Sequence, residues 1–375
     1  MKSYNHLWEK FISEENIRLA IIKSSKGKRN RKAVRDIYEN PDRWIGKIRA
    51  YAEDFRNYKH NPVEIYDGIV RKKRTILVPH YMEQIIHHMI VNVLTPIFSH
   101  GMYEHSYGSI PNRGAHKGKK AIEKWIMHDK KNIKYCLKMD IRKYFDSIPQ
   151  KILKEKLSDL IHDRRFFQVL EELIGATEHG IPLGFYTSQW IANWYLQKLD
   201  HYIKEELRAK HYIRYMDDMV IFGSNKRQLH RIREQICSYL RNFLGLEMKQ
   251  NWQVFRFDYV KGGKRHGRFL DFMGFKFYRD KTTLRKSIML KATRKAKRIH
   301  KKAKATIHDI RQMMAYIGWI DCTNTYGMYL YRIKPYVDFG KLKKRISKFD
   351  KKQKGKTRNE NTISKIGIGD TAISA

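Results

Sequence analysis

The chain has 375 residues, of which 78 are Lys or Arg and 38 are Asp or Glu, so its formal net charge at pH 7 is +40. This excess favours a polyanionic partner, while an apolar content of 42% is enough for a sizeable core and excludes wholesale disorder. The three cysteines lie far apart without CxxC spacing, which argues against a disulfide framework and a zinc module.

Residues 1–60 are expected to form an N-terminal helical extension. Apolar residues recur at helical spacing from Leu7 to Ile21, and a basic turn at 23–32 interrupts them. Glu and Lys stand where a signal peptide needs an apolar run, and polar residues break the longest apolar stretch, 85–98. We therefore expect a cytoplasmic protein that has no membrane among its partners.

The next segments predict a hairpin and a buried helix. The β-rich run at 64–79 reads as a basic hairpin that ends at Pro79, which cannot donate a ladder hydrogen bond. From Met82 to Phe98 apolar residues recur at helical spacing on a mostly apolar segment. This pattern predicts a helix in the core.

Strands and helices alternate in the middle of the chain. The expected elements are a strand at 135–141, helices at 152–161 and 165–174, a Gly-Ile-Pro-Leu-Gly loop at 180–184 that leads into one helix, and strands at 212–215 and 219–222 joined by a turn at 216–218. Together they indicate an α+β unit with a small antiparallel sheet.

Beyond residue 280 the sequence becomes helical and strongly basic. Lys or Arg occupies most positions of 291–304, a pattern typical either of a solvated face or of a contact with the phosphate backbone of a nucleic acid, and the net charge of the chain favours the contact. The tail at 351–375 is poor in apolar residues, so we expect it to be disordered.

Three aspartates stand out against the basic background. Asp140 ends an apolar strand, and Asp217 and Asp218 occupy the turn of the Tyr-Met-Asp-Asp hairpin. Carboxylates held by a sheet can converge on Mg²⁺, which prefers oxygen ligands and completes its shell from substrate phosphates. Two such ions can assist phosphoryl transfer. An Asp-Asp pair alone is more typical of ordinary turn chemistry, so the order of the other motifs decides the interpretation.

That order resembles a reverse transcriptase: a strand-end aspartate, a glycine loop leading into a helix, and a YxDD hairpin. The resemblance covers most of the chain, through the basic hairpin at 71–74, SYGSIPNRGAHKGKK (106–120), LEMKQNWQVF (246–255) and FLDFMGFKFYRD (269–280). It implies a right-hand polymerase fold, with fingers and palm at 61–280 and a short basic helical thumb at 281–350.

Several segments resemble the reverse transcriptases of diversity-generating retroelements in particular. They are LGFYTSQWIANWYL at the glycine loop, SYNHLWEKFISEENI, NWQVF, YIGWIDCTNTY and KPYVDFGKLKKRISKFDKK. One departure is Phe185, where that subfamily commonly has Asn after the loop glycine. An antiphage-defence reverse transcriptase that uses a structured non-coding RNA is the alternative.

The resemblance assigns roles residue by residue. Asp140, Asp217 and Asp218 would be catalytic and would bind two Mg²⁺ ions, for which Mn²⁺ can substitute, with the Ile141 carbonyl as a further ligand. The implied nucleotide-binding residues are Lys72, Arg74, Phe145 as a steric gate, Leu183, Gly184 and Gln189. Lys249 lies where related polymerases place a lysine near the pyrophosphate, but in a different register.

The implied activity is RNA-directed DNA synthesis. The partners would be a template RNA, the primer–cDNA duplex, dNTPs and a small basic accessory protein. In the diversity-generating reading, the template is a dedicated repeat RNA and copying is error-prone at its adenines. A rival of another class is an RNA-binding scaffold with a decayed polymerase centre, which would be expected to have lost an aspartate.

Overall fold

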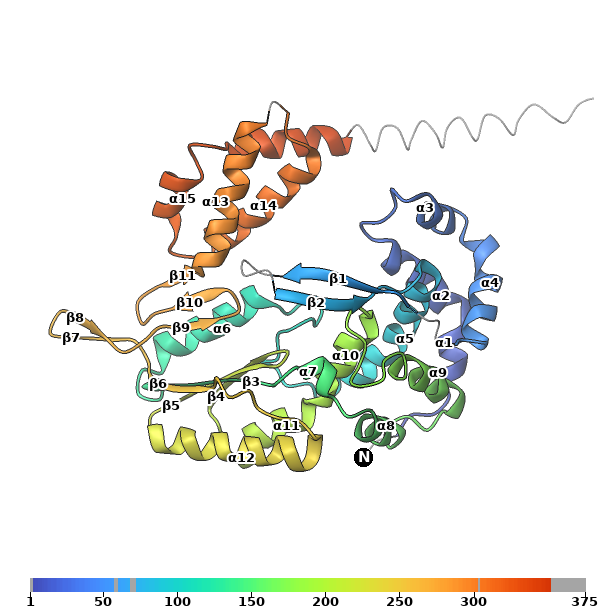
Figure 1. Cartoon of the computed structure of the whole chain (residues 1–375), viewed down its shortest axis with the longest axis horizontal. Coiled ribbons are helices and arrows are strands. Elements are labelled where there is room, and N and C mark those ends of the chain that lie inside the picture. Colours follow the sequence, from blue (N-terminus) through green and yellow to red (C-terminus); the bar gives the residue numbers. More distant parts are fainter. Residues whose placement is uncertain (1–2, 57–59, 68–71, 303, 352–375) are drawn as a thin grey trace, which may run out of the picture. The chain divides into compact units, whose positions relative to one another are not determined.

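The computed structural model describes residues 3–56, 60–67, 72–302 and 304–351 of the chain (Figure 1). The chain forms two compact units, Met1–Arg268 and Phe269–Ala375. Residues 269–280, which sequence reasoning placed with the fingers and palm, fall in the second unit. The tail expected to be disordered lies, from residue 352 on, outside the described residues.

The first unit begins with four short helices and a long buried helix. The short helices are α1 (Leu7–Ile12), α2 (Glu14–Ser25), α3 (Lys32–Glu39) and α4 (Pro41–Glu53), and the long helix is α5 (Tyr81–Ser99). Of the short helices, α1, α2 and α4 pack on α5, and α3 packs on α2 and α4. The Ser13 side chain caps α2 by accepting a hydrogen bond from the Asn16 amide. Helices α2 and α10 (Tyr186–Tyr195) both contact α5, which confirms the prediction of a core helix at 82–98.

The predicted basic hairpin is present between the N-terminal helices and α5. Strands β1 (Pro62–Asp67) and β2 (Lys72–Leu77) pair in antiparallel fashion, with Ile65 opposite Arg74. The strand β2 ends at Leu77, two residues before Pro79, where the prediction placed the end of the hairpin. Residues 68–71, which include Arg71, lie outside the described part of the chain.

A four-stranded antiparallel sheet, in the order β4-β5-β3-β6, organises the middle of the unit. Its strands are β3 (Tyr135–Asp140), β4 (His211–Tyr215), β5 (Asp218–Gly223) and β6 (Gln253–Arg256). Helix α12 (Lys226–Leu244) contacts β3, β5 and β6 and covers one face (Figure 1). Its start is fixed by Asn225, whose side chain accepts hydrogen bonds from the backbone amides of Arg227 and Gln228 in the first turn of the helix.

The remaining elements of this unit connect the sheet to the helices. They are α6 (Ala115–His128), α7 (Tyr144–Ser147), α8 (Gln150–Ser158), α9 (Arg164–Ile174), α11 (Gln197–His201), the π-helix η1 (Tyr202–Glu206), β7 (Tyr259–Lys261) and β8 (Lys264–His266). The single helix predicted after Gly184 is therefore interrupted: the structure divides it into α10, α11 and η1 in succession.

The second unit combines a three-stranded sheet with helices. Its strands are β9 (Leu270–Phe272), β10 (Phe275–Phe277) and β11 (Thr282–Leu284), and its helices are α13 (Lys286–Lys301), α14 (Ile307–Asp321) and α15 (Tyr326–Arg332), with a further helical run at 339–351. Thr306 and Asp309 form a capping box at the start of α14. The whole chain thus mixes helices and strands, as predicted.

Candidate active site

Three aspartates meet at one end of the four-stranded sheet. Asp140 is the last residue of β3, Asp218 is the first of β5, and the two are direct partners across the antiparallel ladder. Asp217 precedes Asp218 in the turn after β4. The sheet register therefore brings together the carboxylates that sequence reasoning selected, from positions far apart in the chain.

The carboxylates repel one another. The pKa of Asp217 is raised to about 7 by burial, by the charge of Asp140 and a hydrogen bond with it, and by the charge of Asp218. The Nζ atom of Lys249 donates to Oδ2 of Asp140 at 3.0 Å, and this hydrogen bond raises the pKa of Lys249. Lys249 offsets part of the negative charge that the three carboxylates carry when ionised, so the ionised site still favours a cation.

The donor set fits Mg²⁺ bound together with substrate. Within the residues that the structure describes, no group of three or more His, Cys, Asp or Glu side chains could hold a metal ion by itself. Mg²⁺, however, rarely uses an all-protein cage, and it commonly binds through one or two carboxylates together with substrate phosphates and waters. Asp140, Asp217 and Asp218 offer the oxygen ligands that such a site needs.

A short ladder fixes Lys249 beside Asp140. Ile141 faces Met248 in an isolated antiparallel bridge. The flanking hydrogen bonds, both 2.8 Å, run from the Lys249 amide to the Asp140 carbonyl and from the Arg142 amide to the Glu247 carbonyl. These two bonds do not use the Ile141 carbonyl, so its role as a metal ligand stays a prediction. Sequence reasoning gave Lys249 little weight because of its register.

A buried ion pair between Arg214 and Asp200 supports the turn that carries Asp217. Arg214 of β4 is fully buried and donates to the carboxylate of Asp200 in α11, from Nε at 2.8 Å and from Nη2 at 2.6 Å. Its Nη1 donates to the carbonyl of Met216 at 3.0 Å, and Met216 has a left-handed backbone with a φ of 56°. Because the guanidinium is planar and rigid, Arg214 links α11 to the residue that precedes Asp217.

Asn193 of α10 extends this network to a third segment. Its buried Nδ2 donates to the Gly108 carbonyl at 2.8 Å, while its Oδ1 accepts from Arg214 Nη1 at 3.2 Å. A Cβ on Gly108 would lie 2.6 Å from the Met216 amide nitrogen, so only glycine allows this close approach to the turn. We call Asn193, Asp200 and Arg214 the turn-anchoring network.

Sequence reasoning missed the turn-anchoring network. The available signal was Arg214 itself, a charged residue inside an otherwise buried apolar strand. Such a charge is tolerated when it is paired, which predicts a buried acidic partner. The sequence does not show which of the 38 acidic residues is the partner.

The glycine loop is attached to the hairpin. The Leu77 amide, at the end of β2, donates to the Leu183 carbonyl at 2.8 Å. Gly184 has a φ of +111°, and a Cβ there would lie 2.1 Å from the Leu77 carbonyl oxygen. Gly184 is thus required by packing within the chain, while its predicted approach to a base pair stays a prediction. Leu183 is half-buried, and Gln189 is exposed on α10.

The other predicted nucleotide-binding residues lie on α7 and β2. Phe145 of α7 is half-buried against the core, and its carbonyl accepts a hydrogen bond from the Ile181 amide at 2.9 Å. Arg74 is exposed on β2. Lys72 begins β2, and its side chain lies outside the described residues.

Comparison with known proteins identifies the family. The family described as reverse transcriptase (RNA-dependent DNA polymerase) matches residues 59–277, more than half of the chain. The chain belongs to the reverse transcriptase family. Its match interval contains the three aspartates, the glycine loop and the hairpin. Divalent metal ions, generally Mg²⁺, serve catalysis in reverse transcriptases.

Individual relatives are distant. The retron Ec73 reverse transcriptase of Escherichia coli is 24% identical over 212 residues, which cover 52% of this chain and 64% of that protein. The COX1/OXI3 intron 2 protein of Saccharomyces cerevisiae is 28% identical over 147 residues, covering 36% of this chain and 16% of that protein. This reverse transcriptase therefore spans less than two thirds of either relative.

A solved structure shows limited similarity. Apo telomerase from Candida tropicalis aligns with a TM-score of 0.48 and 13% identity, covering 73% of this chain and 56% of that one, a level too low to carry an argument. Among the described residues of this reverse transcriptase, none of the helices combines the length and apolar character needed to span a bilayer.

Proposed function

We propose that the protein is an RNA-directed DNA polymerase with a right-hand fold. The hairpin and the helices around it would form the fingers, the four-stranded sheet the palm, and the basic helices from α13 onward the thumb. The observation that carries this proposal is the convergence of Asp140, Asp217 and Asp218 at one end of the sheet. All three are present, which disfavours an RNA-binding scaffold with a decayed polymerase centre.

The reaction would join a dNTP to a primer on an RNA template. The primer 3′-hydroxyl attacks the α-phosphate, a new P–O bond forms, and pyrophosphate leaves with the electrons of the broken bond. Two Mg²⁺ ions, held by the three aspartates, would supply charge stabilisation for the attacking and leaving oxygens. Lys249 adds a positive charge beside Asp140, and the turn-anchoring network keeps Asp217 in place.

The remaining predicted residues would select the nucleotide. Phe145 would occupy the space of a ribose 2′-hydroxyl and so favour deoxynucleotides. The Arg74 guanidinium would stack on the incoming base and pair with triphosphate oxygens, together with Lys72. Leu183, Gly184 and Gln189 would contact the nascent base pair from the glycine loop and α10.

Within the family, we favour a diversity-generating reverse transcriptase. The motifs around the glycine loop and in the C-terminal part support it, and they imply a dedicated repeat RNA as template, errors at its adenines and a small basic accessory protein. The retron relative supports the alternative, an antiphage-defence enzyme that uses a structured non-coding RNA.

Primer extension on a defined RNA template tests the activity. Wild-type protein should extend a DNA primer in Mg²⁺, and Asp217→Asn should remove extension while RNA affinity stays near wild type, because the amide keeps the size but loses the charge. Extension by the variant at the wild-type rate would refute the metal assignment. Sequencing of the cDNA distinguishes the subfamilies, since equal accuracy at all four template bases would favour the defence enzyme.

A further inference from the structure

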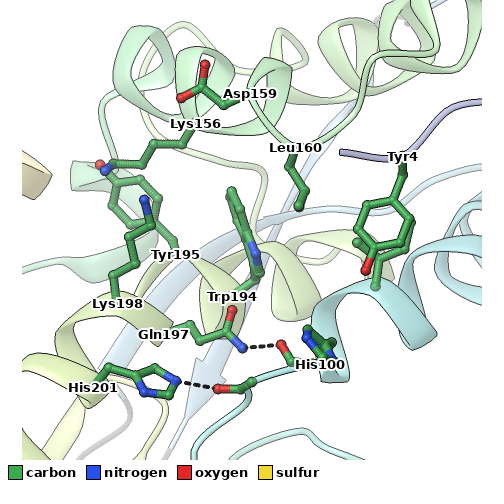
Figure 2. A pocket seen from close by; sticks show the side chains of 12 residues that line it. Tyr4, His100, Lys156, Asp159, Leu160, Trp194, Tyr195, Gln197, Lys198 and His201 are labelled. Atoms are coloured by element: carbon green, nitrogen blue, oxygen red, sulfur yellow. Dashed lines mark hydrogen bonds between the residues drawn. The ribbon is translucent and has the colours of Figure 1, made fainter. Parts of the chain in front are cut away.

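A hollow of about 300 Å³ lies in the first unit, and it shares no residue with the candidate active site. Four segments far apart in the sequence form its walls. The lining residues are Tyr4, Ile97, His100, Gly101, Lys156, Asp159, Leu160, Trp194, Tyr195, Gln197, Lys198 and His201 (Figure 2).

The indole of Trp194 is the central surface of this hollow. Its ring stacks on Phe98, with the centroids 5.1 Å apart and an interplanar angle of 15°. Phe98 is fully buried and does not line the hollow, so it supports the indole from the core. Tyr4 lies on the opposite side of the hollow from Lys198 (Figure 2). A rigid aromatic surface of this kind is suited to stacking with a planar ring.

Hydrogen bonds hold the walls in place. The Tyr4 amide donates to the Leu160 carbonyl at 2.9 Å, and the His162 amide donates to the Tyr4 carbonyl at 3.0 Å. On the other side, Gln197 Nε2 donates to the His100 carbonyl at 2.7 Å. The hollow is therefore formed before any ligand arrives, which lowers the entropic cost of binding.

The rim carries two ammonium groups. Lys156 comes from α8 and Lys198 from α11, and both side chains border the hollow on the side where Figure 2 draws Tyr195. Burial, and then the nearby charge of Lys198, lowers the pKa of Lys156, although Asp159 and Glu155 act in the opposite direction. An anionic group between the two lysines would relieve this repulsion.

We propose that the hollow binds an unpaired nucleotide, with the base against Trp194 and the phosphate between Lys156 and Lys198. The volume falls at the lower end of the range for small-molecule sites, about 300–1,000 Å³, so it admits one nucleoside and excludes a duplex. The nucleotide comes either from a single-stranded part of the bound RNA or from a free mononucleotide. Only the first of these sources, the bound RNA, depends on the polymerase function proposed above.

Photocrosslinking tests where the base goes. A single-stranded oligouridylate RNA that carries 4-thiouridine is crosslinked to the full-length protein, and the crosslinked peptides are identified by mass spectrometry. We expect crosslinks at Trp194 or Tyr4. Crosslinks confined to other segments would overturn the proposal and leave the hollow to a different ligand, such as a protein side chain.

Affinity measurements test the phosphate contact. We expect Lys156→Ala combined with Lys198→Ala to weaken oligouridylate binding about tenfold more than the control pair Lys151→Ala and Lys226→Ala. The control changes the net charge equally at two exposed lysines outside the hollow. Equal reductions in affinity for the two double variants would refute a specific contact.

Further measurements distinguish a free mononucleotide from RNA as the ligand, and failure of the nucleotide site from failure of the proposed polymerase activity. Equilibrium dialysis with UMP distinguishes a free nucleotide from RNA, because only a mononucleotide site retains UMP with an affinity that the lysine pair reduces. Trp194→Leu, checked for folding by its melting temperature, should weaken oligouridylate binding, and unchanged affinity would refute stacking on this ring. Primer extension by wild type is measured in parallel, so that failure of the proposed function is seen independently of the crosslinks.

Discussion

The turn-anchoring network makes Asn193→Ala an informative substitution. The change removes the hydrogen bond from Nδ2 to the Gly108 carbonyl and the bond that Oδ1 accepts from Arg214. It leaves the ion pair between Arg214 and Asp200 intact. The turn that carries Asp217 should therefore lose part of its support without a buried charge being left alone.

The expected loss of stability is moderate. Each of these two bonds contributes about 1 kcal/mol net, and the buried Gly108 carbonyl that loses its donor adds about 1–3 kcal/mol, which gives about 3–5 kcal/mol in all. The substitution should also lower the rate of primer extension, because it displaces the turn that carries Asp217. A displacement of a reacting group by about 1 Å can cost roughly 100-fold in rate, so we expect kcat to fall by about 10- to 100-fold.

A matched control is available in Asn16. This asparagine is also buried, and its Nδ2 donates to the carbonyls of Phe11 in α1 at 2.9 Å and of Met89 in α5 at 3.1 Å. Both variants are assayed for urea unfolding and for primer extension over a range of Mg²⁺ concentrations. Asn193→Ala should raise the Mg²⁺ concentration for half-maximal rate, and Asn16→Ala should not. Identical Mg²⁺ dependence in the two variants would refute the anchoring argument.

Four further predictions follow from named contacts. Gly184→Ala should destabilise the protein by about 1–3 kcal/mol in urea unfolding, because the new Cβ would clash with the Leu77 carbonyl. As a control, Gly46→Ala inside α4 has open space at its Cβ and should stabilise the protein by about 0.5–1 kcal/mol. Asp217→Asn should raise the melting temperature in EDTA by removing one repelling charge, and should abolish the increase that Mg²⁺ gives wild type; a lower melting temperature would contradict this. Neutralising four exposed basic side chains of α13, namely Arg294, Lys297, Arg298 and Lys301, should reduce the salt slope of duplex binding by about 0.9 for each phosphate that the helix no longer neutralises. An unchanged slope would show that this face contacts solvent. Leu183→Gln should make cDNA more accurate opposite template adenines, since an amide can restore a polar contact worth about 1 kcal/mol, and sequencing that shows no change would contradict the proposed fidelity role.

The same helix shows how the structure refines a prediction made from charge alone. Lys295 belongs to the basic stretch that we interpreted as a nucleic-acid contact, but its Nζ donates to Asp309 at 2.7 Å and its side chain is 12% exposed. Lys302 also pairs with Asp309, at 2.6 Å. Sequence composition counts both lysines as part of a surface, whereas the folded chain uses them to join α13 to α14.

Local patterns in the sequence predicted the elements well where the pattern was strong. The hairpin around Asp217 was expected from two short apolar runs, and β4 and β5 occupy those positions. The interruption after α10 was not predicted, because a π-helix has no simple apolar period that distinguishes it from a continuing α-helix. The partner of Arg214 was also hidden, since a contact between a strand and a helix depends on the tertiary fold.

The hydrogen bond between Leu77 and Leu183 makes the hairpin and the glycine loop mechanically dependent on each other. A change of twist in β2 would pull on the loop backbone through this bond and through the close contact at Gly184. Substitutions on the hairpin can thus alter the loop without touching it. A laboratory search for variants with altered accuracy should therefore randomise the C-terminal half of β2, residues 75–77, together with residues 180–184, because each segment limits the conformations open to the other.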